Sequence, residues 1–167
     1  MRPTDEVEDL MEIFGETIDR ELPDLAQEGV RTRFIGRRDR APEWLREKMK
    51  RLEAETAENE RLHLWIAFDY GGRGEIVEAV RRLLTSGADP ASLDEDVLSS
   101  HLYAPEMPDP DLVIRTSGEY RMSNFLLWQS AYAELVFLDT LWPDFDEEHL
   151  RSALEEFARR RRRFGGR

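Results

Sequence analysis

Residues 62–68, Leu-His-Leu-Trp-Ile-Ala-Phe, form an almost continuous apolar run in a chain of which 36% of the residues are charged. Only His63 interrupts the run. A strand that is buried on one face alternates apolar and polar residues, whereas a strand covered on both faces is apolar throughout. The run therefore predicts a strand of a parallel sheet that helices cover on both sides, and so an α/β fold.

Helical patterns alternate with short apolar runs along the rest of the chain. Apolar residues recur at helical spacing within residues 7–18, 45–52 and 76–83, and further strands are expected at 30–36, 111–114 and 134–139. The first helical segment is expected to end at Gly29, and Asp146 is expected to cap a last helix. This order predicts a mostly parallel sheet flanked by helices. No internal repeat or long linker divides residues 1–167, so we expect a single domain.

Composition excludes several classes of protein. The net charge of −12 argues against non-specific binding of nucleic acid by the body of the protein, because phosphates would be repelled. The chain has no cysteine, which excludes disulfides and thiolate metal sites. No apolar stretch approaches the roughly 18 residues of a membrane span, and the N-terminus lacks the layout of a signal peptide. We expect a cytoplasmic protein and leave open a peripheral contact with a membrane surface.

Two segments each allow two interpretations. The turn Gly71–Gly74 lies between an expected strand and an expected helix, so its amides could cradle a phosphate or could simply form a tight turn. It is not a dinucleotide-binding fingerprint, because Val77 stands where a third glycine is needed. The run Arg159–Arg163 is either a solvated helix end or a nucleic-acid tail. We favour the helix end, because no aromatic stacking surface accompanies the run.

Residues 115–123 concentrate polar side chains between two apolar runs. Arg115 stands where the strand 111–114 should end, and Glu119, Arg121 and Ser123 follow it. Ligands of open α/β sheets bind beyond the carboxyl ends of strands, and guanidinium and hydroxyl groups are good partners for anions. We favour diphosphate binding over a structural network of ion pairs. A carboxylate at Glu134, at the start of the next strand, could hold Mg²⁺ against such an anion.

Several motifs, in order, resemble the signature of the cis-prenyltransferases, the family that includes undecaprenyl diphosphate synthase. The longest are residues 109–129 (DPDLVIRTSGEYRMSNFLLWQ) and 131–135 (AYAEL), followed by LWPDF at 141–145 and RRFGG at 162–166. Shorter matches upstream are RP at 2–3, FIG at 34–36, DYGGR at 69–73 and SSHLY at 99–103. The resemblance covers essentially the whole chain and implies an undecaprenyl diphosphate synthase-like fold.

The resemblance also implies an activity, in which isopentenyl diphosphate is condensed onto an allylic diphosphate with Mg²⁺ and a cis double bond is formed. By motif, Arg115, Arg121 and Ser123 are expected to bind the isopentenyl diphosphate. Glu119 is expected to support the arginines, and Glu134 to help place Mg²⁺. The helix at residues 7–18 is expected to line the wall that holds the growing hydrocarbon chain, and the lipid product implies peripheral membrane contact.

Residues at both ends of the chain match further motifs of the family. Arg163 and Gly165 match an Arg-x-Gly motif that reaches the active site of the neighbouring subunit, which implies a homodimer or a heteromer. Arg2 matches an Arg-Pro motif and is expected to approach the isopentenyl diphosphate. Asp69 departs from the Asn that other members have at this position, and we attach no functional consequence to the difference.

One motif of the family has no counterpart here. Asp-Gly-Asn-Gly-Arg-Trp, which carries the catalytic aspartate and binds the allylic diphosphate, does not occur in residues 1–167. We therefore expect the C-terminal two-thirds of a cis-prenyltransferase, lacking the N-terminal strands and helices, most of the allylic site and any catalytic residue. The isolated chain is expected to have little or no synthase activity. The alternatives are a non-catalytic accessory subunit of a heteromeric enzyme and, from another class, a nucleic-acid-binding protein.

Overall fold

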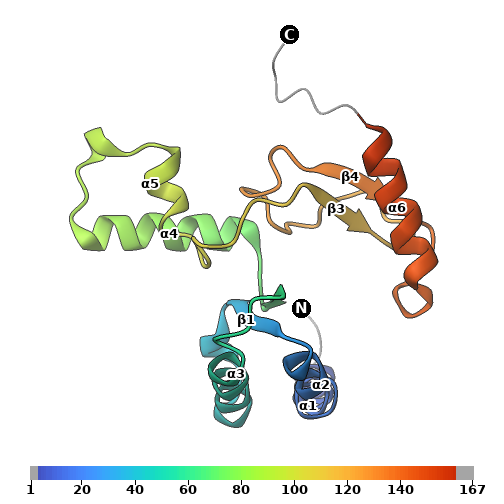
Figure 1. The fold of residues 1–167 in the computed structure, drawn as a ribbon. Coiled ribbons are helices and arrows are strands. Elements are labelled where there is room, and N and C mark those ends of the chain that lie inside the picture. The colour runs from blue at the N-terminus through green and yellow to red at the C-terminus, as the bar shows by residue number, and fades with distance from the viewer. Residues whose placement is uncertain (1–3, 161–167) are drawn as a thin grey trace. The chain divides into compact units, whose positions relative to one another are not determined.

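The computed structural model describes residues 4–160, in which helices alternate with parallel strands (Figure 1). The elements are α1 (Thr4–Arg20), α2 (Leu22–Gln27), β1 (Val30–Gly36), α3 (Glu43–Glu55), β2 (Leu62–Phe68), α4 (Gly72–Ser86), α5 (Glu95–Ser99), β3 (Leu112–Arg115), β4 (Glu134–Phe137) and α6 (Glu147–Arg159). The predicted α/β class is confirmed. The strands form two separate parallel pairs, β1 with β2 and β3 with β4.

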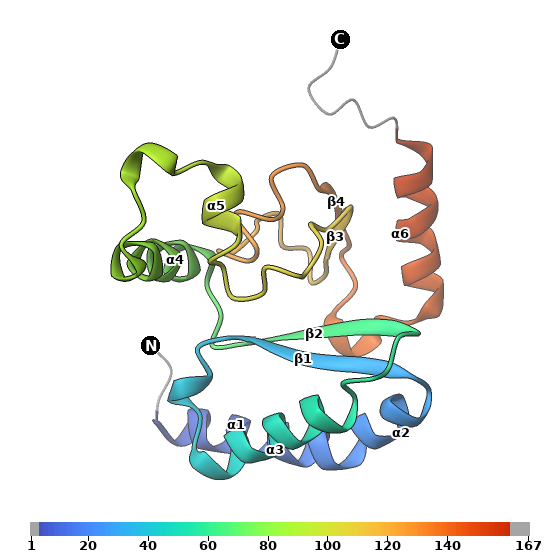
Figure 2. The same cartoon turned by 60° about the vertical axis from the view of Figure 1, so that its left-hand side comes forward.

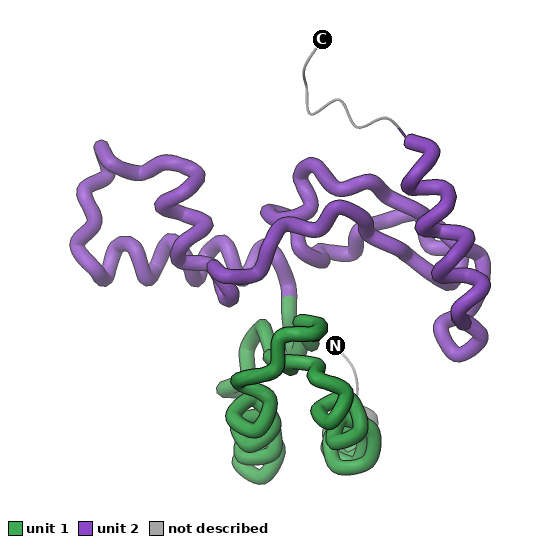
Figure 3. The backbone as a smooth tube through the Cα atoms, in the orientation of Figure 1, with its two compact units in different colours: residues 1–70 green, residues 71–167 purple. Residues whose placement is uncertain are grey.

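The chain divides into two compact units after Tyr70, unit 1 before this point and unit 2 after it (Figure 3). Each strand pair belongs to one unit. The assignment of residues 1–167 to a single domain stays a prediction.

Unit 1 is a two-stranded sheet with helices packed on one of its faces. The strands β1 and β2 pair in register from Val30 opposite Leu62 to Gly36 opposite Phe68. Helices α1, α2 and α3 lie on the same side of this sheet (Figure 2). Eight buried residues form the core between the helices and the sheet: Ile18, Leu22, Phe34, Ala41, Leu45, Met49, Leu52 and Phe68.

One sequence-based expectation for unit 1 is wrong in detail. The helix expected to run to Gly29 is split into α1 and α2, because Pro23 lacks an amide hydrogen and is found in the first turn of a helix rather than within it. Strand β2 has the predicted bounds, and the helices of unit 1 cover one of its faces. Leu64 and Ile66 pack on the core, whereas His63 and Ala67 point to the opposite side, so the cover expected on both faces of β2 stays a prediction.

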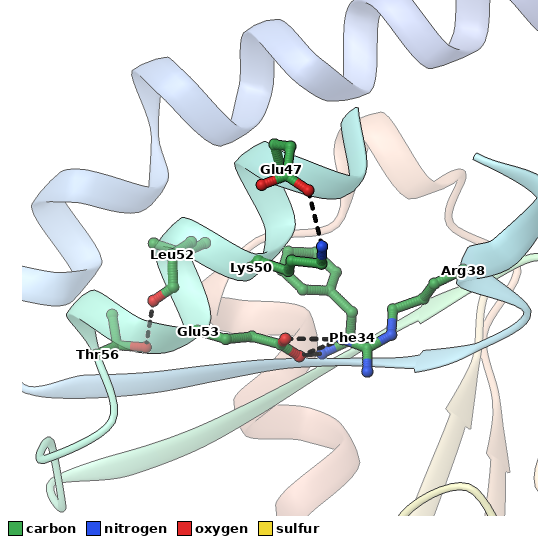
Figure 4. A network of polar contacts seen from close by, with 7 residues as sticks. All are labelled: Phe34, Arg38, Glu47, Lys50, Leu52, Glu53 and Thr56. Carbon is green, nitrogen blue, oxygen red and sulfur yellow. Dashed lines mark hydrogen bonds and ion pairs between the residues drawn. The ribbon is translucent and has the colours of Figure 1, made fainter. Parts of the chain in front are cut away.

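A polar network fastens α3 to β1 in unit 1 (Figure 4). The carboxylate of Glu53 accepts a hydrogen bond from the backbone N–H of Phe34 at 2.9 Å and pairs with Nη1 of Arg38 at 2.7 Å. The hydroxyl of Thr56 donates to the carbonyl of Leu52 at 2.9 Å and accepts from the N–H of Thr32 at 3.1 Å. These bonds satisfy backbone donors that face the helix, which an apolar contact would leave unpaired.

Unit 2 is built around the shorter pair β3 and β4. The pair runs in register from Leu112 opposite Glu134 to Arg115 opposite Phe137. Helix α6 packs on β4, and α4 packs with α5. Asp146 caps α6 as predicted, because its Oδ1 accepts a hydrogen bond from the N–H of His149 at 3.1 Å. Among the helices in residues 4–160, none is both long and apolar enough to cross a membrane.

Candidate functional site

Arg115 is the last residue of β3, at the carboxyl end of the parallel pair, where its position in the sequence predicted it. Its carbonyl accepts a hydrogen bond from the N–H of Leu138 at 2.8 Å, which fixes the end of the strand. Its Nε is buried, and no atom of the described residues accepts a hydrogen bond from it. A buried guanidinium donor without an acceptor is costly, and an unsatisfied buried group of this kind calls for an explanation, of which a functional role is one.

The loop after Arg115 folds back along the chain that leaves β4. The N–H of Ser117 donates to the carbonyl of Thr140 at 2.7 Å, and the N–H of Gly118 donates to that of Leu138 at 2.9 Å. Ser117 has a φ of 72°, a left-handed conformation that is uncommon for a residue with a side chain. The loop is therefore held in one place by β4, beside the end of β3.

A cavity of about 280 Å³ lies at this end of the strand pair. Its lining combines Arg115 and Arg121 with apolar and small residues, namely Val113, Ile114, Thr116, Met122, Phe125 and Trp142. Arg121 forms an ion pair with Glu119. The role of Glu119 in supporting the arginines stays a prediction. Cationic and apolar groups in one cavity suit a ligand that joins an anionic group to a small hydrocarbon.

Ser123 is not part of this lining. It is exposed, has a φ of 47° and precedes Asn124, which contacts the first turn of α4. The structure thus brings Arg115 and Arg121 together in the cavity lining and pairs Glu119 with Arg121, and it leaves Ser123 on the adjoining part of the loop.

Glu134 lies at the other end of the strand pair. It is opposite Leu112 in the register, whereas Arg115 is opposite Phe137, a separation of about 10 Å at roughly 3.3 Å per residue. The Glu134 carboxylate accepts a hydrogen bond from Nη1 of Arg160 at 2.9 Å. The bond from Arg160 to Glu134 raises the pKa of the arginine, and the pair with Glu156 adds to this effect. Within one chain, Glu134 therefore pairs with a cation and does not face the arginine cavity.

The described residues do not by themselves make a site for Mg²⁺. Magnesium prefers carboxylate oxygens, phosphates and water in an octahedral arrangement. No group of three or more His, Asp or Glu side chains in residues 4–160 is arranged to hold a metal ion. The assignment of Glu134 to Mg²⁺ stays a prediction.

Arg2, Arg163 and Gly165 lie outside the described residues, so their predicted roles stay predictions. The described part of the arginine run behaves as an ion-paired helix end. Arg159 pairs with Glu155 at 3.7 Å, and Arg160 donates to the carbonyl of Leu135 at 2.8 Å.

Sequence analysis did not identify two residues that organise this part of unit 2. Asn124 accepts hydrogen bonds from the first turn of α4. Glu75, in the same turn, is 1% exposed and accepts from the amide of Gln129 at 3.2 Å and the N–H of Tyr103 at 3.0 Å. The asparagine before an apolar run was the only local signal, because asparagine tolerates the left-handed conformation. An acid in a first helical turn is ordinarily a surface residue.

Comparison with known proteins identifies similar chains. A family model described as putative undecaprenyl diphosphate synthase matches residues 1–165. An isoprenyl transferase of Thermotoga maritima is 50% identical over 167 residues, which are 99% of this chain and 72% of that protein. The ditrans,polycis-undecaprenyl-diphosphate synthase ((2E,6E)-farnesyl-diphosphate specific) of Escherichia coli K12 is 49% identical, over 99% of this chain and 67% of that protein.

A solved structure is also similar. Lavandulyl diphosphate synthase from Lavandula x intermedia, in complex with dimethylallyl diphosphate, has a TM-score of 0.93 and 35% sequence identity. The match covers 98% of this chain and 73% of that chain.

Proposed function

Because the chain belongs to the undecaprenyl diphosphate synthase family, whose members are prenyltransferases, we propose that it binds isopentenyl diphosphate for a cis-prenyltransferase reaction. The observation that carries this proposal is that Arg115 and Arg121 line one cavity together with an apolar wall. The Nε of Arg115 is in addition buried and has no hydrogen-bond partner among the described residues. In the reaction, isopentenyl diphosphate is joined to an allylic diphosphate.

The chemistry of the isopentenyl partner explains why arginine suits this cavity. In the condensation the allylic carbon–oxygen bond breaks and the isopentenyl double bond attacks the allylic carbon. A proton is then lost, and the isopentenyl diphosphate group stays attached to the product. Its binding site must therefore hold the diphosphate without activating it as a leaving group. The isopentenyl carbon–oxygen bond is not allylic and does not ionise readily, so its diphosphate needs only to be held. Guanidinium groups hold it well, because they bind phosphate oxygens through paired hydrogen bonds.

The apolar lining suits the hydrocarbon part of the same substrate. Val113, Ile114 and Phe125 lie in the cavity wall beside Arg115. A five-carbon group packed on such residues gives up contact with water, at about 25 cal/mol for each Å² that is buried. Diphosphate and hydrocarbon are thereby held at a fixed separation, which orients the double bond.

The remaining parts of the active site belong to the proposal as well. We assign the catalytic aspartate and the allylic site to the family motif that residues 1–167 do not contain, and therefore expect binding without chain elongation from this chain alone. Mg²⁺, which would supply charge neutralisation for the diphosphates, is assigned to Glu134 by motif. The Arg-x-Gly motif with Arg163 and Gly165 is assigned to an active site shared between subunits of a dimer.

Calorimetric titration of the 167-residue chain with isopentenyl diphosphate tests the binding. We expect saturable binding that weakens about tenfold or more in Arg115→Gln, which removes a charge-assisted hydrogen bond worth roughly 1.5–3 kcal/mol. Arg81→Gln is the matched control, because Arg81 is an exposed arginine of the same unit outside the cavity. Equal affinity of wild type and Arg115→Gln would contradict the proposal.

An elongation assay with farnesyl diphosphate and labelled isopentenyl diphosphate tests the second part. We expect no polyprenyl product from the isolated chain. Measurable elongation would show that the chain has a complete active site, and would leave the binding proposal in place.

A further inference from the structure

Helix α4 begins without a side chain of its own to cap it. Its N-cap residue is Gly71, and the amides of the first helical turn need acceptors from elsewhere. Asn124, 51 positions from Arg73 in the sequence, supplies them. Its Oδ1 accepts from the N–H of Arg73 at 2.9 Å, and its backbone carbonyl accepts from the N–H of Gly72 at 2.8 Å.

The two glycines of this turn make room for the loop that carries Asn124. A Cβ at Gly71 would lie 2.6 Å from Nδ2 of Asn124, and a Cβ at Gly72 would lie 3.0 Å from the backbone N of Leu127. The glycine-rich turn was open to interpretation as a phosphate cradle. Since the amides of Gly72 and Arg73 already bond to Asn124, the tight-turn interpretation accounts for these glycines better.

The loop itself adopts a strained conformation. Ser123, Asn124 and Leu126 have φ values of 47°, 65° and 43°. Left-handed conformations cost roughly 1–3 kcal/mol for residues other than glycine and persist only where their surroundings enforce them. Two sets of contacts hold the loop in this conformation. Asn124 bonds to the start of α4, and Nε2 of Gln129 donates to the two carboxylate oxygens of Glu75 at 3.2 and 3.3 Å.

We infer that Asn124 is a positioning residue, which holds the neighbouring Ser123 in the conformation that serves diphosphate binding. The inference rests on the proposed function together with the motif match, by which Ser123 is expected to bind the isopentenyl diphosphate although it lies outside the lining of the cavity. Asn124 suits the task because it tolerates a positive φ and its side chain reaches the helix at the same time. Helix α4, which contributes no residue to the arginine cavity, thereby sets the geometry of the anion-binding loop.

A double-mutant cycle on the full chain tests this, with isopentenyl diphosphate as the titrant. Ser123→Ala is expected to raise the Kd about tenfold or more, because its hydroxyl would donate to a charged diphosphate and such hydrogen bonds are worth roughly 1.5–3 kcal/mol. Asn124→Ala is expected to raise it by a similar factor. The double variant should bind no more weakly than either single variant, because both changes remove the same contact.

Two further Asn124 variants keep the test meaningful if Asn124→Ala folds poorly. Asn124→Gly retains the positive φ without the side-chain bond and should bind weakly while it stays folded. Asn124→Asp keeps the acceptor for Arg73. Its added negative charge weakens the binding of an anion as such, so the comparison is made within this background, where Ser123→Ala should still raise the Kd about tenfold. The matched control is Asp94→Ala, which removes a side-chain cap from α5 in the same unit and should leave the Kd unchanged.

The outcomes separate the two proposals. If wild type and Arg115→Gln bind the ligand equally, the proposed function fails and the role of Asn124 fails with it. If Arg115→Gln weakens binding but Asn124→Ala and Asn124→Gly bind like wild type, or the losses of Asn124→Ala and Ser123→Ala add, the positioning role is overturned and the proposed function stands.

Discussion

At the scale of single residues, the least expected feature is the burial of Glu75. An apolar stripe that includes Val77, Val80 and Leu83 was expected to form the buried face of this helix. In the structure Leu83 is buried, but Val77 and Val80 are 50% and 39% exposed, and Glu75 and Ala79 complete the buried face. The carboxylate is retained there because two donors from distant segments converge on it, and a buried polar group is tolerated when it is hydrogen-bonded.

Two substitutions of Glu75 distinguish how much its hydrogen bonds and its negative charge each contribute to the free energy of unfolding. Glu75→Ala removes the acceptor of the Tyr103 N–H and the Gln129 amide, and should lower the free energy of unfolding by about 2–4 kcal/mol. Glu75→Gln should cost less than about 1 kcal/mol. Gln129 can turn its amide over in that variant, because its Oε1 is buried without a partner in the described chain.

Urea unfolding followed by circular dichroism measures both variants of Glu75. Glu78→Ala, on the same helix and in an exposed ion pair with Arg81 at 3.4 Å, is the control and should change stability by less than about 0.5 kcal/mol. A loss in Glu75→Gln equal to that in Glu75→Ala would show that the negative charge matters more than the hydrogen bonds.

The position of one candidate site residue in the fold could be predicted from the sequence, for a local reason. Arg115 could be placed at the end of β3 because the apolar run before it marks the strand. Asn124 and Glu75 could not be recognised, because their partners lie 51 and 54 positions away and no short pattern encodes such contacts. The separation of Glu134 from Arg115 follows from strand register, which one sequence does not reveal.

At the scale of elements, the bounds of β1 and β2 agree with the sequence because apolar runs and turn residues mark them. The split between α1 and α2 was missed, although Pro23 was visible. The helical spacing of apolar residues continues across a break when both helices pack on the same core.

The glycines of α4 should respond in opposite ways to substitution by alanine. A Cβ at Gly74 meets no atom within 4 Å, so Gly74→Ala should raise stability by about 0.5–1 kcal/mol through helix propensity. Gly72→Ala should lower stability by about 1–3 kcal/mol, because the new Cβ would lie 3.0 Å from the backbone of Leu127. Urea unfolding of the two variants side by side measures the difference. Changes of the same sign would show that the loop moves freely away from the helix.

The side chain of Asp146 caps helix α6, and its contribution to the stability of the fold should depend on pH. The hydrogen bonds from the N–H and the ring of His149 lower the pKa of Asp146 below its ordinary value of 3.8. The folded state therefore binds the proton less readily than the unfolded state. The stabilisation is fully present above the ordinary pKa and is lost as the pH falls through the lowered one.

Asp146→Asn keeps a capping side chain but removes the titration. Thermal unfolding between about pH 6 and pH 3 should show wild type more stable than the variant at the upper end, with the difference shrinking toward the lower end. A difference in Tm that stays constant over this range would mean that Asp146 does not titrate differently in the folded and unfolded states.

At the scale of the whole molecule, a sequence pattern predicts that strands exist but not which strands pair. The expectation that the strands run mostly parallel is confirmed, since both observed pairs are parallel. It did not reveal that the described strands form two pairs in two units. Pairing depends on contacts between segments that are far apart in the chain, which periodicity within a single run cannot encode.

The two units should differ in local stability, because they bury their residues differently. In unit 1, seven paired positions join β1 and β2 over one cluster of eight buried residues, whereas four paired positions join β3 and β4 in unit 2. Backbone hydrogen bonds over a larger buried cluster open less often. We therefore expect the amides of β1, β2 and α3 to exchange with deuterium at least about tenfold more slowly than those of β3 and β4, after correction for intrinsic rates.

Hydrogen exchange of the full chain, resolved by residue, measures this, and Leu45→Ala serves as a control. Leu45 is fully buried in unit 1, so its truncation should accelerate exchange in β1 and β2 more than in β3 and β4. Equal protection of both pairs in wild type, or equal acceleration of both in the variant, would show that the two units open as one cooperative structure.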